Sequence, residues 1–283
     1  MERIATIGFF DGVHKGHRYL FEHLQAEGTK RGLDPLIVTF AEHPRAVLQS
    51  DYIPQLLTTP DERQRLLSAF GEVVMLPFEE VHSLTAKEFL TLLHDRYGVH
   101  VLLMGYDHRF GSDRLQHPHQ YRLVGEETDV EVLTMNEYTE GEWHVSSTEI
   151  RAALENGNIA LANELLGRPY ALSGKVVHGK AVGRTIGFPT ANIVPDAGKI
   201  IPKQGVYMAY VHTPTRNDAP TFVNIDANGT IEAHIPSFKG DLYGQVLKIH
   251  FLRFLREEKQ FGSLEELRAQ IKDDIDSILR PDA

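Results

Sequence analysis

The chain has 283 residues, of which 42% are hydrophobic, and it carries 29 Lys and Arg against 39 Asp and Glu, a net charge of −10. This acidic balance argues against general binding of nucleic acid, which needs a basic surface. Because the sequence has no cysteine, disulfides, thiolate metal sites and cysteine nucleophiles are excluded. The opening residues do not resemble a secretory signal, and no apolar stretch is long enough to span a bilayer. We therefore expect a cytoplasmic protein that binds neither membranes nor nucleic acid.

The first half of the chain alternates short apolar runs with segments of helical spacing. Residues 17–31 and 86–97 have apolar side chains at the spacing of a helix. The runs between them predict buried strands at 3–10, 36–40, 73–78, 99–105 and 130–135. Continuously apolar strands separated by helices indicate a parallel sheet covered on both faces. We predict an α/β domain of Rossmann-like type, in which ligands bind at the carboxyl ends of the strands.

The pattern changes near residue 170, where β-prone runs follow each other closely, separated by Gly and Pro turns. These runs predict a small β-barrel, with strands near 170–177, 205–212, 221–225, 230–235 and 246–255. The last element, 263–279, reads as a helix, and Ser263 with Glu266 forms the pattern of a capping box. We place the domain boundary after a helix that ends near Leu166, giving domains 1–168 and 169–283.

Two histidines, His14 and His17, follow the first predicted strand and an Asp-Gly turn, at the start of a predicted helix. Backbone N–H groups and the helix dipole favour anions at that position. A metal site would need a third ligand and usually an i, i+4 pair, and neither is evident here. Solvent-facing turn histidines are the alternative, but Gly12 and Gly16 favour close approach of a ligand. We predict that the two histidines contact phosphate.

The run from Gly8 to His17 resembles the G-x-F-D-G-x-H-x-G-H signature of nucleotidyltransferases that transfer AMP or CMP to a phosphate. Residues 105–114, GYDHRFGSDR, resemble the nucleotide-contacting loop of one branch, although the glycine that commonly follows the Arg is absent. Residues 145–154, VSSTEIRAAL, resemble its Ser/Thr-Arg motif, which covers the phosphates. Together the three segments are similar to the bacterial bifunctional riboflavin kinase/FAD synthetase family.

This resemblance implies catalytic roles for His14, His17 and Arg151. It implies nucleotide or phosphate contacts for Gly8, Phe10, Asp11, Gly12, Gly105, Asp107, Phe110, Ser146, Ser147 and Thr148. From the residues alone, the Ser146-x-x-Glu149 pattern equally fits a capping box, and Arg151 fits a solvated surface charge.

In the second half, residues 178–193, HGKAVGRTIGFPTANI, form a glycine-rich loop that runs into a strand. Its N–H groups are suited to phosphate, and Thr190 and Asn192 point the same way, so their oxygens could share one Mg²⁺. An ordinary Gly-rich barrel turn is the alternative. The segment resembles the flavokinase motif, which implies a six-stranded flavokinase-type β-barrel with a closing helix, and Mg²⁺-ATP at Thr190 and Asn192. It also implies nucleotide or phosphate contacts at Gly179, Gly183, Arg184 and Gly187.

The flavokinase resemblance extends to the strand 232–235, E-A-H-I, where Glu232 matches the catalytic base that accepts the proton of the ribityl hydroxyl. A base of this kind contributes about 10²–10⁴-fold to a rate. Arg256, Glu257 and Phe261 fall where the family lines its flavin pocket, although an ordinary strand-to-helix turn explains them too.

One departure concerns the connection between Ile225 and Glu232. The family usually runs through Gly-x-x-Pro-Thr-Phe before its glutamate strand, whereas this chain goes from Ile225 directly to Asp226. Either the loop is deleted, which puts kinase activity in doubt, or a segment is missing from the chain.

We predict an enzyme that phosphorylates riboflavin with ATP to FMN and then joins FMN to the AMP of a second ATP, giving FAD and pyrophosphate. Mg²⁺ is expected at both sites. One alternative is an FMN adenylyltransferase with a disabled kinase barrel, and another is a flavin-binding module without turnover. A third, a cytidylyl- or pantetheine-type transferase, is disfavoured because such enzymes have no use for a flavokinase barrel.

Overall fold

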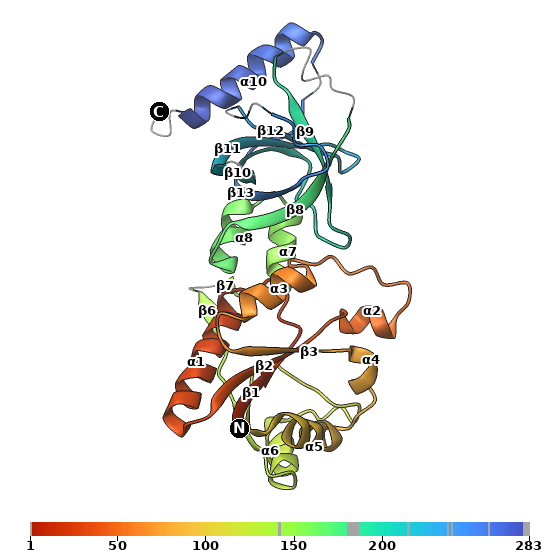
Figure 1. The fold of residues 1–283 in the computed structure, drawn as a ribbon, viewed down its shortest axis with the longest axis vertical. Helices are drawn as coiled ribbons and strands as arrows, with labels where there is room; N and C mark the ends of the chain where they lie inside the picture. The colour runs from red at the N-terminus through yellow and green to blue at the C-terminus, as the bar shows by residue number, and fades with distance from the viewer. Residues whose placement is uncertain are drawn as a thin grey trace. The chain divides into compact units, whose positions relative to one another are not determined.

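A computed structural model describes residues 2–140, 143–179, 187–213, 216–236, 238, 240–259 and 261–279. The chain divides into two compact units, Met1–Ser147 and Thr148–Ala283. The first unit is a parallel sheet covered by helices, and the second is a β-barrel with helices of its own (Figure 1). The functional boundary that we predict between residues 168 and 169 lies further along the chain and stays a prediction.

The sheet of the first unit has five parallel strands in the order β3-β2-β1-β4-β5. They are β1 (Arg3–Ile7), β2 (Asp34–Phe40), β3 (Glu72–Leu76), β4 (Val99–Met104) and β5 (Glu131–Thr134). The five predicted strands and the predicted Rossmann-like α/β class are confirmed. The order reverses between β1 and β4, and their carboxyl ends therefore form the crevice where ligands of such folds bind.

The helices of this unit cover both faces of the sheet. They are α1 (Lys15–Arg31), α2 (Pro44–Leu48), α3 (Pro60–Leu67), α4 (Phe78–Val81), α5 (Ala86–Tyr97) and α6 (Pro118–Glu126). Ile4 and Ile37 pack in one core with α1, whereas their neighbours Ala5 and Val38 pack in the other with α5. This alternation along each strand is why the runs are continuously apolar. A short hairpin, β6 (Thr139–Glu140) with β7 (Trp143–His144), follows the sheet.

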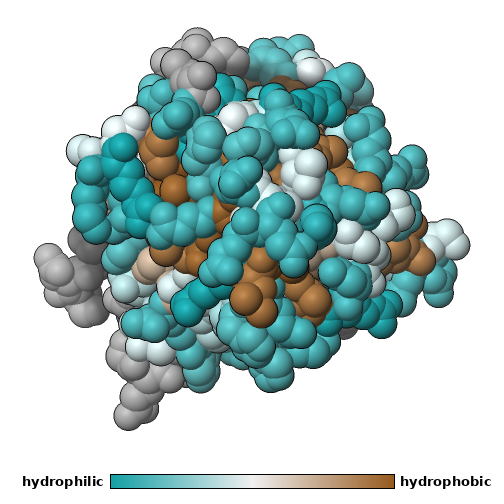
Figure 2. All heavy atoms as spheres, turned by 90° about the horizontal axis from the view of Figure 1, so that it is seen from below, coloured by the Kyte–Doolittle hydropathy of each residue, from teal (hydrophilic) through white to brown (hydrophobic). Residues whose placement is uncertain are grey.

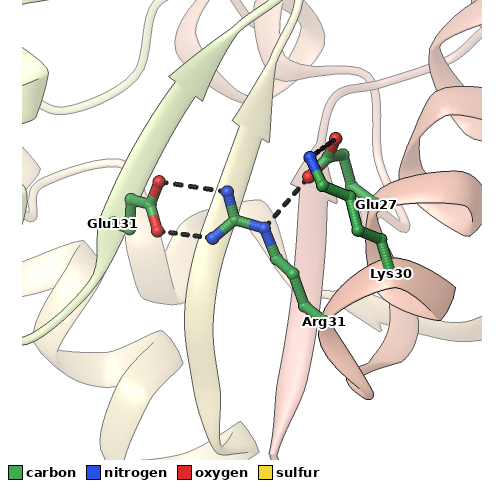
Figure 3. A network of polar contacts seen from close by, with 4 residues as sticks. All are labelled: Glu27, Lys30, Arg31 and Glu131. Carbon is green, nitrogen blue, oxygen red and sulfur yellow. Dashed lines mark hydrogen bonds and ion pairs between the residues drawn. The ribbon is translucent and has the colours of Figure 1, made fainter.

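A network of charged side chains joins the end of α1 to the first residue of β5 (Figure 3). The Arg31 guanidinium donates to both carboxylate oxygens of Glu131, at 2.5 and 3.2 Å, and through Nε to Glu27 at 3.0 Å. Lys30 donates to the other oxygen of Glu27 at 3.2 Å. These contacts raise the pKa of Arg31 and lower that of Glu27. The network lies at the amino end of β5, away from the crevice.

The second unit is a closed barrel of six antiparallel strands in the order β10-β11-β12-β9-β8-β13. They are β8 (Tyr170–Val177), β9 (Thr190–Pro195), β10 (Gly205–Thr213), β11 (Arg216–Ile225), β12 (Ile231–His234) and β13 (Val246–Arg256). The helices are α7 (Ser147–Glu155), α8 (Ile159–Leu166) and α10 (Leu264–Leu279). The backbone N–H of Glu266 donates to Ser263 Oγ at 3.2 Å, which caps α10 as predicted. The predicted barrel with its closing helix is confirmed.

The surface is mostly hydrophilic where it is drawn in Figure 2, with hydrophobic side chains in patches bounded by polar ones. Within the described ranges, no helix combines the length and the apolar character needed to cross a membrane. The cytoplasmic location stays a prediction.

Candidate active sites

A cavity of about 290 Å³ lies at the carboxyl ends of β1 and β4, where the strand order reverses. Its wall includes eight of the residues predicted from the nucleotidyltransferase resemblance: Gly8, Phe10, His14, His17, Gly105, Asp107, Ser146 and Ser147. These residues come from three segments far apart in the sequence. The fold therefore brings the core of the predicted nucleotide site into one cavity.

His14 is the N-cap of α1, and this fixes its tautomer. Its Nδ1 accepts a hydrogen bond from the backbone N–H of His17 at 3.3 Å. A nitrogen that accepts carries no proton, and neutral His14 is therefore protonated at Nε2. The His17 ring stacks on the His14 ring with the centroids 3.5 Å apart, and the edge of Phe10 meets it at 5.2 Å. The two imidazoles are held in place by packing and capping.

The loop that leads into α1 has an unusual backbone. Phe10 and Val13 have φ of 53° and 43°, in the left-handed region that side chains other than glycine rarely adopt. A Cβ on Gly8 would lie 2.6 Å from the Phe10 ring, so only glycine leaves room for that ring. Strained residues cluster at functional sites, and this strain coincides with the predicted signature.

Asp11 has a different environment from the rest of the signature. Its buried carboxylate accepts hydrogen bonds from the backbone N–H groups of Leu57 and Thr58, at 3.0 and 2.9 Å, and from Thr58 Oγ1 at 3.0 Å. Gly12 N–H in turn donates to Thr58 Oγ1 at 3.0 Å. Neither Asp11 nor Gly12 is among the described residues that line the cavity. The two residues fasten the loop to segment 57–58, and their predicted phosphate contacts stay predictions.

A buried arginine lies behind this loop. The Arg63 guanidinium is fully buried, stands 4.1 Å from the centroid of the Phe9 ring, and donates to the carbonyl of Phe40 at 2.6 Å. Burial lowers the pKa of Arg63 to about 10, and the negative charge of Asp11 opposes that shift. Asp11 therefore also compensates a buried positive charge.

The remaining predicted residues of the first half occupy other positions. Phe110 packs in the core beside Tyr121, whose hydroxyl accepts from the Phe110 N–H at 3.1 Å, so it anchors the loop 105–115. Helix α7 begins at Ser147, which puts Ser146 directly before it, as a capping residue requires. Thr148 and the half-buried Arg151 lie on α7 in the second unit, and their predicted roles stay predictions.

Sequence reasoning missed the cavity wall formed by Tyr106, His108, Glu137 and His144. Glu137 accepts a hydrogen bond from His144 Nδ1 at 2.7 Å and another from the Tyr106 hydroxyl, and both lower its pKa. Burial lowers the pKa of His108 to about 4, which keeps this imidazole neutral at pH 7. Tyr106 and His108 lie within the segment 105–114 that resembles the nucleotide-contacting loop, whereas no sequence signal identifies Glu137 and His144.

In the barrel, a cavity of about 330 Å³ contains the predicted base Glu232, together with Thr190, Arg256 and Phe261. Its wall is largely apolar and aromatic, and it includes residues that sequence reasoning missed: Phe188, Val206, Phe222, Asn224, His234, Leu267, Ile271 and Asp274. A second cavity of about 340 Å³ also has Thr190 in its wall, with Pro189, Phe238 and Tyr243. Thr190 therefore borders two cavities, an arrangement suited to two substrates.

Strand register places the predicted metal ligands next to the predicted base. Glu232 is the cross-strand partner of Asn192 on one side and of Asn224 on the other. A Cβ on Gly179 would lie 2.1 Å from the Asn192 amide, so the backbone of Gly179 lies directly on that side chain. Gly187 has φ of 87°, which favours glycine. Gly183 and Arg184 lie outside the described residues.

Two of the three predicted flavin-pocket residues line the first barrel cavity. Arg256 also forms a bidentate ion pair with Asp274 of α10, with Nη2 to Oδ2 at 2.7 Å and Nε to Oδ1 at 3.1 Å. This pair holds α10 against the end of β13. Glu257 is instead exposed and pairs with Lys203 at 3.0 Å. It is not among the described residues of the cavity wall, and its predicted flavin contact stays a prediction.

The connection between β11 and β12, where the family loop is absent, is a closed turn. Asp226 Oδ1 accepts from the N–H groups of Asn228 and Thr230, both at 2.8 Å, and Gly229 has φ of 75°. The turn joins the two strands without a break in their register.

Comparison with known proteins assigns both halves of the chain. A family model described as FAD synthetase matches residues 1–149, and one described as riboflavin kinase matches residues 166–280. The bifunctional riboflavin kinase/FMN adenylyltransferase of Escherichia coli K12 is 38% identical over 282 residues, which is 96% of this chain and 90% of that protein. The chain belongs to the family of bifunctional riboflavin kinases/FMN adenylyltransferases.

A second relative carries the same description, and one solved structure shares the fold under a different title. The Bacillus subtilis member of the family is 33% identical and covers 98% of this chain and 92% of its own length. A crystal structure titled macrolide-efflux protein, from Streptococcus pneumoniae, has a TM-score of 0.88 at 32% identity, covering 98% of this chain and 93% of that one. The prediction of an enzyme with both activities, which makes FMN and then FAD, is confirmed by the family match.

Proposed function

We propose that the first unit binds ATP in the cavity at the ends of β1 and β4 and transfers its AMP to the phosphate of FMN. The observation that carries this proposal is the cavity itself, with His14 and His17 at the start of α1 and Ser146 and Ser147 on the same wall. An oxygen of the FMN phosphate attacks the α-phosphorus of ATP, a new P–O bond forms, and pyrophosphate leaves. The substrates supply all the reacting atoms, and the protein positions them and stabilises charge.

His14 and His17 stabilise the negative charge that develops during this transfer. The capping bond of His14 Nδ1 puts its proton on Nε2, which makes Nε2–H a donor to a phosphate oxygen. The N–H groups at the start of α1 add a positive dipole at the same point. Arg151 is the predicted cation for the leaving pyrophosphate.

The variant His14→Asn separates capping from phosphate binding. Asparagine is a strong N-cap, so α1 stays capped, while the donor at Nε2 is lost. Removing one such donor costs about 10²–10³-fold in kcat. We expect FAD formation from FMN to fall by that factor in His14→Asn and in His17→Ala, with riboflavin phosphorylation in the same preparation unchanged. Unchanged FAD formation in both variants would remove the phosphate role of the histidines.

In the barrel, we propose that riboflavin occupies the cavity that contains Glu232 and that ATP occupies the cavity on the other side of Thr190. Three phenylalanines in the wall of the first cavity, Phe188, Phe222 and Phe261, suit a flat aromatic ring system. Glu232 accepts the proton of the ribityl hydroxyl as its oxygen attacks the γ-phosphorus and ADP leaves.

Magnesium fits the oxygen donors beside Glu232. Thr190 and Asn192 alternate with the buried Ala191 and therefore lie on one face of β9, with a hydroxyl and an amide oxygen of the kind that Mg²⁺ prefers. Bound there with ATP, Mg²⁺ would neutralise charge on the phosphates. Among the residues that the structure describes, no group of three or more His, Cys, Asp or Glu could hold a metal, so the oxygen donors of β9 are the better candidates.

The first experiment incubates the protein with ATP and Mg²⁺, in one tube with riboflavin and in another with FMN, and separates the flavins over time. We expect FMN and then FAD from riboflavin, and FAD from FMN. FAD from FMN with no product from riboflavin would mean that the barrel is disabled. In Glu232→Gln we expect riboflavin phosphorylation to fall about 10²–10⁴-fold, with FAD formation from FMN unchanged.

A further inference from the structure

His234 has no role in the chemistry described so far, yet it lies near the proposed base and beside a proposed metal ligand of the kinase site. It lies two residues after Glu232 on β12, is 8% exposed, and lines the same cavity. Its cross-strand partner is Thr190. Its ring meets the Phe188 ring edge-on, with the centroids 5.5 Å apart.

The contact that defines this side chain is with the backbone before Thr190. His234 Nδ1 lies 2.8 Å from the carbonyl oxygen of Pro189. A carbonyl oxygen only accepts, so Nδ1 carries the proton and donates. A neutral ring that donates from Nδ1 has its lone pair on Nε2.

This hydrogen bond acts on the segment Phe188–Pro189–Thr190. The three residues follow the glycine-rich loop and lead into β9, and both Phe188 and Thr190 line the cavity of Glu232. A tether at the middle residue fixes where the Thr190 hydroxyl and the Phe188 ring stand. Misplacement of reacting groups by about 1 Å can cost 10²-fold in rate.

We propose that His234 is a positioning residue of the kinase reaction, whose Nδ1–H holds the Pro189 carbonyl and thereby sets Thr190 and Phe188 against the two substrates. The inference rests on the proposed function of the barrel. His234 acts through these neighbours and transfers no proton itself.

Three variants separate the two ring nitrogens. His234→Asn keeps a donor near the position of Nδ1, His234→Gln keeps one near the position of Nε2, and His234→Leu keeps neither. We expect His234→Asn to retain kcat and the KM for ATP of riboflavin phosphorylation within a few-fold. We expect His234→Gln and His234→Leu to lose about 10²-fold in kcat/KM for ATP. FAD formation from FMN, measured in the same samples, stays unchanged in all three.

The tautomer gives a test that does not depend on turnover. A long-range ¹H–¹⁵N correlation spectrum of the wild-type protein reports which nitrogen of each histidine carries the proton, and His234→Asn assigns the signal. We expect Nδ1–H, the less common neutral form. A proton on Nε2, an active His234→Gln beside an inactive His234→Asn, or equal activity in all three variants would each overturn the proposal. A wild-type protein without kinase activity but with Nδ1–H at His234 would overturn the kinase function, and the positioning role with it, while leaving the hydrogen bond to Pro189 in place.

Discussion

Asp11 distinguishes two roles for a residue of the signature loop. The resemblance predicts that Asp11 contacts phosphate, whereas in the structure its carboxylate binds the backbone of Leu57 and Thr58 and fastens the loop. The change is Asp11→Asn, which keeps the shape of the side chain and removes its charge. One oxygen remains to accept from Thr58 and from the Leu57 N–H, which the wild-type carboxylate binds through both oxygens, while the new NH₂ group faces that same N–H, donor against donor.

The expected loss follows from these contacts. A hydrogen bond to a charged group contributes about 1.5–3 kcal/mol, and a buried donor left unpaired costs about 1–3 kcal/mol. The buried guanidinium of Arg63 also loses the charge that compensates it. We therefore expect Asp11→Asn to lower the free energy of unfolding of the first unit by about 3 kcal/mol.

Urea unfolding measures this directly, because the chain has one tryptophan and Trp143 lies in the first unit. With m-values of about 1–3 kcal/mol/M, the midpoint in tryptophan fluorescence falls by about 1–3 M. The matched control is Asp107→Asn, which changes an exposed aspartate of the cavity wall and is expected to raise the KM for ATP at an unchanged midpoint. An Asp11→Asn protein as stable as the wild type, with a raised KM for ATP, would refute the structural role.

Three further outcomes follow from the contacts described. Because Glu131 is half exposed, Glu131→Gln should lower the free energy of unfolding by less than about 1 kcal/mol despite its short ion pair, which urea unfolding measures. His108 has a folded pKa near 4, below its unfolded value of about 6.5, so the free energy of unfolding decreases as the pH falls from about 6.5 to about 4. In His108→Phe the slope of this decrease should be smaller by up to about 1.4 kcal/mol per pH unit. Arg256→Gln and Asp274→Asn should each raise the KM for riboflavin, and the double variant should be no worse than either, since the two side chains act through one ion pair.

Hydrophobic periodicity was enough to predict most of the fold. The helix expected at 86–97 has those bounds in the structure, because its apolar face and its capping residues Thr85 and Gly98 coincide. The short hairpin β6–β7 was missed, since two-residue strands have no periodicity to read. The position of the histidine pair at the carboxyl end of a strand could be predicted from the sequence, because a strand, a turn and the start of a helix follow each other within a few residues.

The parts of the sites that were missed depend on contacts across the fold. Asp11 meets residues 57 and 58, which its local sequence cannot reveal. Asn224 and Phe222 line the barrel cavity because the register of β11 on β12 puts them beside Glu232 and His234, and register is a property of two strands together.

The turn between β11 and β12 bears on whether the barrel can act as a kinase. In the family, the absent loop would extend from this edge of the site. Here Asp226 closes the turn with its own side chain, and Gly229 supplies the left-handed residue that the turn needs. The pairing of β11 with β12 then runs from Ile225–Ile231 to Phe222–His234 without a shift. Glu232 and His234 consequently keep their places opposite Asn192 and Thr190. The short connection therefore changes the rim beside the cavity and leaves the proposed base, metal ligands and tether in register, which is why we expect riboflavin to be phosphorylated.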